Sequence, residues 1–322
     1  MNRKKLLAVG ILFINLVSCS SIKKVATNQM GDMIFETSEA VFTEDNWDLF
    51  ESTIDSNIKL VENLYAADRE NPEFIVTLIK AYSGKAFAID ETYYLKDQLQ
   101  ELSNSKYRTN ALANYTRALN YSALFFEVKG FKDFDFTRYI SSPEEFQKLL
   151  NDNFSDDATD IEGVFYTGQT LAAIINLQRD NMRAVAYLPL AKVMYDWSCE
   201  KNANLAQGAC DIFNASYAAS RPRGLGGDPI KGKRLFEEAI QKWPNNMLVR
   251  LSYIQFYAVP MFEENTYRAQ KLEMNKFNRE NMEPTYWSGG KIETPKVDYN
   301  NLFNLIARKR LKIIEGLEDE IF

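Results

Sequence analysis

Histidine is absent from this chain of 322 residues, and glycine, proline and cysteine are scarce, with 14, 9 and 3 residues. Without imidazole the chain lacks the commonest general base, the commonest metal ligand and every catalytic triad that depends on histidine. Carboxylate pairs or a Ser–Lys pair stay open as catalysts, but 44 acidic residues bring some carboxylates together in any fold. We therefore expect no enzyme activity, no catalytic residues, no metal site and no cofactor.

A basic surface is missing as well. The chain has 38 Lys and Arg against 44 Asp and Glu, a formal net charge of −6. Nucleic-acid binding needs a concentrated positive footprint on the protein surface. The charge balance therefore argues against a nucleic-acid partner.

Long apolar runs are confined to the N-terminus. The basic residues Arg3, Lys4 and Lys5 precede an apolar run at 6–17. This run is too short to span a membrane and has the form of a secretory signal. No comparable run follows, so we expect residues 1–18 to be a removed signal peptide and the remaining chain to face the periplasm or exterior.

The signal ends in the sequence Leu-Val-Ser-Cys, which resembles a bacterial lipobox. Cleavage before Cys19 would leave a cysteine that carries acyl chains and anchors the protein to a membrane. Ser20, rather than Asp, follows the cysteine and favours the outer over the inner membrane. An ordinary signal peptide with a coincidental cysteine is the alternative.

Helical periodicity dominates the rest of the chain, and no stretch alternates with period two between hairpin turns. We expect an all-α protein with a lead-in at 19–46 and one helical-repeat domain at 47–322. The expected helices are Asp48–Glu70, Pro72–Glu101, Ser105–Val128, Pro143–Asn151, Ile161–Arg179, Arg183–Lys201, Ala206–Ser220, Pro229–Trp243, Met247–Tyr257, Glu263–Asn278 and Tyr299–Ile321.

Small and bulky residues recur at tetratricopeptide spacing in three of these helices. Second helices of such repeats carry a small residue, an aromatic four positions later and another small residue three positions after that. Each match follows a compatible first helix, which predicts degenerate tetratricopeptide-like hairpins in one α-solenoid, or superhelical, domain. The matches are Ala111, Tyr115 and Ala118; Ala191, Tyr195 and Ser198; and Gly232, Phe236 and Ala239, with Pro244 beyond.

Cys199 and Cys210 lie on either side of a predicted helical turn near Asn204. Each is about one and a half turns from the bend, so the two side chains can face each other. An oxidising compartment favours a disulfide between them. The alternative is two buried thiols on different helix faces.

The segment "GDPIKGK" contains most of a phosphate-binding loop. Arg234 stands where such a loop has Ser or Thr, and Pro229 removes one of the N–H donors. Asp228 instead suits the N-cap and Pro229 the first position of a helix. We therefore expect a helix joint rather than a nucleotide site, formed by Pro222, Gly226, Gly227 and Asp228.

The run "SRPRGLGGDP" at 220–229, followed by Gly232, Phe236 and Ala239, resembles the TRAP-transporter T-component family of periplasmic lipoproteins. Similarity extends to "KKVATNQMGD", "FIVTLIKAYSGKAFAI", "YAVP" and "RKRLKIIEGLEDEIF". Arg223 departs from the family pattern, as does the long polar segment 265–298.

The resemblance implies a tetratricopeptide-like accessory protein that binds the periplasmic solute-binding protein of a TRAP-type transporter. It also implies a pore or groove for a small hydrophobic ligand such as an organic acid. Homo-oligomers are compatible with this function. The alternative is a structural scaffold lipoprotein for envelope assembly or the cell wall, with no transport role.

First helices line the concave face of a helical-hairpin array. Two aromatic residues one turn apart and an arginine one turn further could cover an apolar chain and pair with its carboxylate. The alternative is that the aromatics fill the core and the arginine caps its helix. The groove residues expected on this basis are Val76 and Lys80, Phe165 and Gln169, and Phe213, Tyr217 and Arg221.

Overall fold

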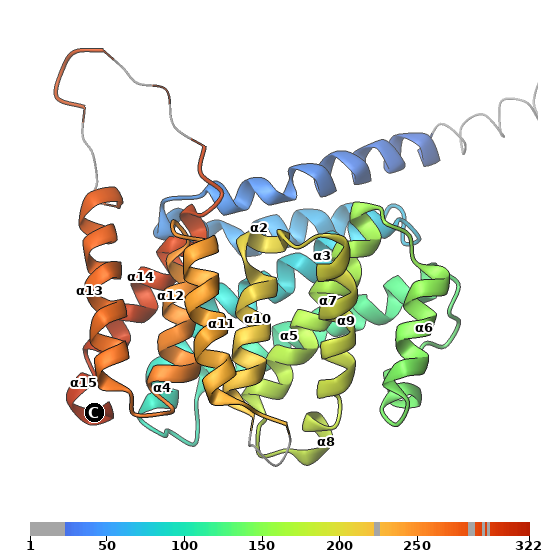
Figure 1. The fold of residues 1–322 in the computed structure, drawn as a ribbon. Coiled ribbons are helices and arrows are strands. Elements are labelled where there is room, and N and C mark those ends of the chain that lie inside the picture. Colours follow the sequence, from blue (N-terminus) through green and yellow to red (C-terminus); the bar gives the residue numbers. More distant parts are fainter. Residues whose placement is uncertain (1–22, 222–225, 283–286, 292–293, 295–296) are drawn as a thin grey trace, which may run out of the picture.

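We describe a computed structural model of the protein, covering residues 23–221, 226–282, 287–291, 294 and 297–322. These residues form helices and no strands, which confirms the all-α fold for the described part of the chain (Figure 1). The α-helices are α2 Trp47–Tyr65, α3 Pro72–Lys85, α4 Glu91–Leu99, α5 Lys106–Val128, α6 Pro143–Asn153, α7 Ala158–Leu177, α8 Met182–Val185, α9 Leu188–Lys201, α10 Ala209–Ser220, α11 Pro229–Lys242, α12 Met247–Tyr253, α13 Glu264–Asn281, α14 Asn301–Glu315 and α15 Glu318–Ile321.

Local side-chain chemistry accounts for most helix starts. Asn46, Asn71, Ser105 and Asp157 each precede a helix and accept a hydrogen bond from a backbone N–H of its first turn. Such capping satisfies donors that have no partner inside the helix. Proline occupies the first turn of α3, α6, α9 and α11, where its missing N–H costs nothing.

Several expected helices are interrupted, among them 299–321, which is divided into α14 and α15. The expected helix 72–101 is a continuous run in which a π-helical turn, Ala86–Asp90, separates α3 from α4. The expected helix 183–201 is divided into α8 and α9, because Pro189 lies in the first turn of a new helix that begins at Leu188. A second π-helical turn, Ile254–Ala258, continues α12. Single π-helical turns are rare and are often found at functional sites.

The expected helix pairs pack against each other. α3 lies against α5, α7 against α9, and α10 against α11, while α12 packs on both α11 and α14. Figure 1 shows α10, α11, α12 and α13 side by side in chain order. These are the pairs in which the small–aromatic–small spacing was found, although their relation to tetratricopeptide repeats stays a prediction.

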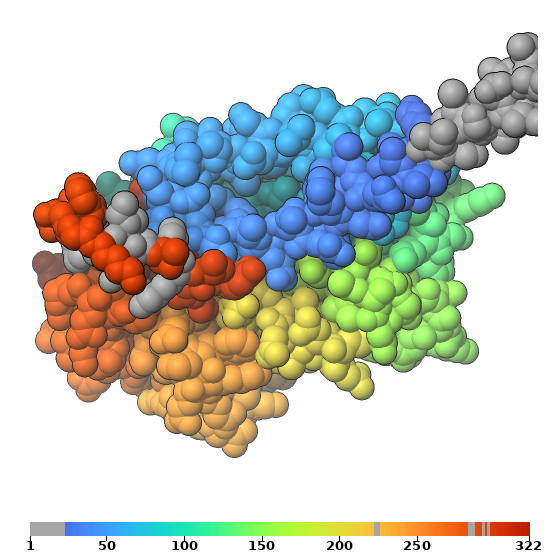
Figure 2. Space-filling view, turned by 90° about the horizontal axis from the view of Figure 1, so that it is seen from above, coloured from blue at the N-terminus to red at the C-terminus, as the bar shows by residue number. Residues whose placement is uncertain are grey.

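The described part of the lead-in, residues 23–46, packs on the helical body formed by the helices from α2 onward. Residues 23–37 form a helix and Ser38–Thr43 a 3₁₀ turn. Thr27 Oγ1 donates to Asp68 at 3.0 Å, and Asn301 Nδ2 donates to the Thr43 carbonyl at 3.0 Å. The segment crosses the upper side of the molecule next to α2 (Figure 1), and Figure 2 shows how it covers that face.

One close helix crossing depends on a missing side chain. A Cβ on Gly232 of α11 would lie 2.6 Å from the Cβ and 2.7 Å from the backbone nitrogen of Ala219 in α10. Gly84 in α3 is the opposite case, because a Cβ there would meet nothing within 4 Å. The two helical glycines therefore differ in whether the space beside them is occupied.

We predict opposite effects of alanine at these two positions. Gly232→Ala should destabilise the protein by about 1–3 kcal/mol through overpacking against the Ala219 backbone. Gly84→Ala should stabilise it by about 0.5–1 kcal/mol, because alanine is the better helix former and meets no obstacle. Urea unfolding followed by circular dichroism measures both, and a stabilised Gly232→Ala variant would contradict the close crossing.

Candidate ligand cavity

A cavity of about 1230 Å³ lies between the lead-in and the helical body. Its walls are the lead-in, α2, α3, α7, α10, the second π-helical turn and α14. Protein interiors are close-packed and hold few voids larger than a water molecule. A space of this size is therefore a feature of the fold and not a packing defect.

Each wall helix presents a stripe of residues with helical spacing. On α7 the stripe is Gln169, Ala172, Ala173 and Asn176. On α3 it is Thr77, Lys80, Ala81 and Gly84, and on α10 it is Ala209, Ile212, Phe213, Ser216, Tyr217 and Ser220. Small side chains on these faces leave the space empty, as the open surroundings of Gly84 show directly.

The structure brings most of the predicted groove residues together. Gln169, Phe213, Tyr217 and Arg221 line the cavity, and so does Lys80. Phe165 does not line it, because α7 packs on α3, α5 and α9 and this ring is fully buried against Tyr195. Val76 is likewise fully buried in the core.

Aromatic rings form one side of the cavity. Phe213 stacks on Tyr195 with ring centroids 3.6 Å apart, and Tyr217 follows at 5.6 Å. The Arg221 guanidinium lies 3.8 Å from the centre of the Tyr217 ring. It donates to the Tyr217 hydroxyl at 3.0 Å and to the Gly226 carbonyl at 2.8 Å, so it ties the end of α10 to the joint.

The joint has the geometry of a helix connector. Asp228 caps α11 by accepting a hydrogen bond from the Lys231 N–H at 3.0 Å. Gly226 has a φ of +82°, and a Cβ on Gly227 would lie 1.8 Å from the Arg221 carbonyl oxygen. Pro222 lies outside the described residues, as does Cys19. The backbone before α11 therefore needs glycine twice, once for its conformation and once for close approach.

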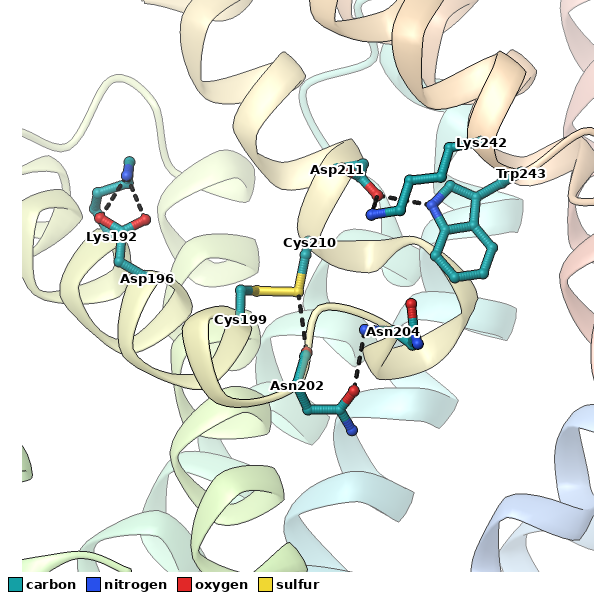
Figure 3. Close-up of a disulfide and its surroundings, with 9 residues drawn as sticks. All are labelled: Lys192, Asp196, Cys199, Asn202, Asn204, Cys210, Asp211, Lys242 and Trp243. Atoms are coloured by element: carbon teal, nitrogen blue, oxygen red, sulfur yellow. Dashed lines mark hydrogen bonds and ion pairs between the residues drawn. A yellow bond between two sulfur atoms is a disulfide. The ribbon is translucent and has the colours of Figure 1, made fainter. Parts of the chain in front are cut away.

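A disulfide between Cys199 and Cys210 joins the end of α9 to the start of α10 (Figure 3). Next to it, Asp211 accepts hydrogen bonds from Trp243 Nε1 at 2.7 Å and from Lys242 Nζ at 2.9 Å, both at the end of α11. The first turn of α10 is thus held on two sides, which positions the face of α10 that lines the cavity.

A buried ion pair connects three of the cavity walls. Lys80 Nζ of α3 lies 3.0 Å from Glu162 Oε2 of α7 and donates to Ser38 Oγ of the lead-in at 3.1 Å. Burial raises the pKa of the Glu162 carboxyl, and the Lys80 charge opposes this shift. The ammonium group also lies 5.3 Å from the centre of the Phe42 ring and 5.4 Å from that of Tyr166.

A second buried polar group was not anticipated from the sequence. Arg310 Nε of α14 donates to Thr92 Oγ1 at 3.0 Å, and its Nη2 lies 4.0 Å from Glu91 Oε2. Tyr115 donates its hydroxyl to the same carboxylate. Burial raises the pKa of the Glu91 carboxyl against the lowering effect of Arg310. The sequence contained one sign of this group: Arg310 is a charged residue on the same apolar face of its helix as Ile306.

Metal-binding chemistry has little support in this region. Among the residues that the structure describes, no three or more Cys, Asp or Glu side chains gather as a metal site would require. The polar groups of the cavity are arginines, a lysine, amides and hydroxyls, together with the carboxylates of Glu44 and Glu91. This set suits a ligand with an anionic or hydrogen-bonding group.

Fold and cavity together define an all-α protein with a mostly apolar cavity of ligand size. The sequence profile of the TRAP transporter T-component family matches residues 43–322, and the chain belongs to this family. The family is one of transporter accessory components and not of enzymes, so membership supports an accessory role in TRAP transport. No curated protein matches the chain by sequence.

Within the described residues, no helix is both long and apolar enough to cross a bilayer. The match begins inside the 3₁₀ turn of the lead-in, so it takes in all the wall helices α2, α3, α7, α10 and α14. The cavity is therefore built largely from the part of the chain that carries the family likeness.

We predict that Lys80→Met destabilises the protein by about 3–5 kcal/mol, because it leaves the Glu162 carboxylate buried without a countercharge. A Lys80→Met, Glu162→Leu double variant should recover most of this loss. Since Glu162 has a raised folded-state pKa, the loss in the single variant should be small near pH 4 and grow as the pH rises through that pKa. Urea unfolding at about pH 4.5 and about pH 8 tests this, and a pH-independent loss would contradict it.

Proposed function

We propose that the protein is a lipid-anchored periplasmic accessory of a TRAP-type transporter. In this proposal it binds the periplasmic solute-binding protein of that transporter and holds a small hydrophobic or organic-acid ligand in its cavity. Cys19 carries the lipid, and the outer membrane is the favoured site of anchoring. The observation that carries the ligand part of the proposal is the cavity of about 1230 Å³ with its aligned small-residue faces.

The chemistry of the lining supports an apolar ligand. Phe42, Ile54, Phe213 and Phe303 contribute apolar surface, while Gln169 adds an amide. Ligand sites in proteins are typically apolar pockets of several hundred Å³ or more with a few polar groups that fix orientation. Phe213, Tyr217 and Arg221 are proposed to bind the ligand, with Tyr217 and Arg221 joined to the connector before α11.

Family membership favours this function over the scaffold alternative. A purely structural envelope lipoprotein has no use for a large apolar cavity, which only lowers stability when it is empty. A ligand of matching shape restores those contacts. A transporter accessory that keeps such a space ready for a ligand accounts for both the family and the cavity.

We predict that Gly84→Phe blocks ligand binding without unfolding the protein, because the ring enters open space within the cavity. Binding of the neutral apolar probe N-phenyl-1-naphthylamine, followed by its fluorescence, should weaken about tenfold or more. Gly84→Ala is the matched control and should bind the probe as the wild type does. A wild-type protein that does not bind the probe would contradict the ligand part of the proposal.

We also predict that Cys19→Ser abolishes lipid labelling and releases the protein from membranes, because the acyl chains are the proposed attachment. Labelling with a radioactive or alkyne fatty acid, followed by fractionation after a salt wash, measures both effects. If the variant still sediments with membranes, the lipid anchor is not what holds the protein there.

A further inference from the structure

The cavity is basic, although the protein as a whole is acidic. Its described lining contains four basic and two acidic residues, against a formal net charge of −6 for the whole chain. A concentration of one charge sign inside a low-dielectric space favours a ligand of the opposite sign. The basic residues are Lys80, Arg179, Arg221 and Arg310, and the acidic residues are Glu44 and Glu91.

Three of the four basic residues are already engaged by the protein. Lys80 pairs with Glu162 at 3.0 Å, and Arg310 is held by the Thr92 hydroxyl and lies 4.0 Å from Glu91. Arg221 donates hydrogen bonds to the carbonyl and the hydroxyl of Tyr217 and to the Gly226 carbonyl. Lys80 and Arg310 therefore maintain the walls, and Arg221 contacts the ligand of the proposed function with its donors already taken up by Tyr217 and Gly226.

Arg179 is different. Its Nε donates to Asn176 Oδ1 at 3.0 Å and its Nη2 reaches the same oxygen, so two donor groups share one neutral acceptor. Within the described residues, no carboxylate lies within 4.0 Å of this guanidinium, and Nη1 makes no hydrogen bond. A guanidinium has five N–H donors, so most of its hydrogen-bonding capacity is unused.

The surroundings of Arg179 match those of a ligand-facing cation. The side chain is exposed and lines the cavity, and partial desolvation by the surrounding protein lowers the pKa of its guanidinium. Access from a cavity combined with desolvation strengthens any charge-assisted hydrogen bond that the group makes.

Arg179 is not required as a helix cap. It follows the end of α7, where free carbonyl groups often attract a basic side chain. The Leu177 carbonyl at this end already accepts hydrogen bonds from Arg108, at 2.9 Å from Nε and 2.6 Å from Nη2. Arg108 therefore caps this end of α7, and Arg179 is not needed for that purpose.

We propose that Arg179 binds the carboxylate of an amphipathic monocarboxylate whose apolar chain lies along the small-residue face of α7. The inference rests on the proposed function, since it requires that the cavity holds a ligand. From Gln169 to the end of α7 at Leu177 the helix axis covers ~12 Å, and Arg179 lies in the turn just beyond it, so this face accommodates an extended alkyl chain. Ala172 and Ala173 provide the apolar surface between the two polar ends, and Asn176 orients the guanidinium.

Decanoate and 1-decanol test this assignment, because they share an apolar chain and differ in charge. Each displaces N-phenyl-1-naphthylamine from the wild type, and decanoate should bind about tenfold to a hundredfold more tightly than decanol. Arg179→Gln should abolish this preference and leave decanol affinity within about twofold of the wild type. Arg179→Lys should keep part of the preference, because it retains the charge without the planar fork.

Arg183→Gln is the matched control. It removes the same charge four residues away, from a residue that is exposed like Arg179 but does not line the cavity, and should bind both compounds as the wild type does. Equal binding of decanoate and decanol by the wild type, or an unchanged preference in Arg179→Gln, overturns the assignment while the apolar cavity stands. Binding of neither compound overturns the proposed function, and the assignment with it.

Discussion

A buried ammonium group holds the walls of the cavity in place. Lys80 of α3 pairs with Glu162 of α7 and donates to Ser38 of the lead-in, so one charge links segments far apart in the chain. A desolvated charge is costly unless its partners stay within hydrogen-bond distance. The relative positions of these three elements are therefore coupled, and the shape of the cavity depends on them. The Phe42 ring, whose centre lies 4.9 Å from that of Phe303, extends the same attachment to α14.

The cavity follows from how each helix divides its surface. α7 buries most of its circumference against α3, α5 and α9, and the remaining face carries Ala172 and Ala173. α10 is fixed at its start by the disulfide and Asp211 and at its end by Arg221, so its cavity face has a defined orientation. The result is a mostly apolar space with polar groups in fixed positions, which suits the proposed ligand-holding role.

Much of the candidate site could be predicted from helical spacing alone. Gln169, Phe213, Tyr217 and Arg221 were expected to face a common groove, and they line one cavity. Phe165 was expected with them but lies in the core, because α7 is apolar on nearly all sides and periodicity does not show which apolar face meets which neighbour. Arg179 was expected only as the last residue of its helix. No local pattern distinguishes an arginine that caps a helix from one that faces a cavity, since that depends on whether Arg108 already caps α7.

The sequence by itself determined the all-α fold, most helix boundaries, the pairing of consecutive helices and the connector before α11. These features depend on capping residues, on proline at first turns and on small residues at close crossings, all of which act over a few neighbouring positions. Only the tertiary structure decided that residues 23–43 pack on the helical body and that Arg310 meets Glu91 at 4.0 Å across more than two hundred residues of chain. Contacts of this kind depend on the mutual orientation of distant helices, which no short stretch of sequence records.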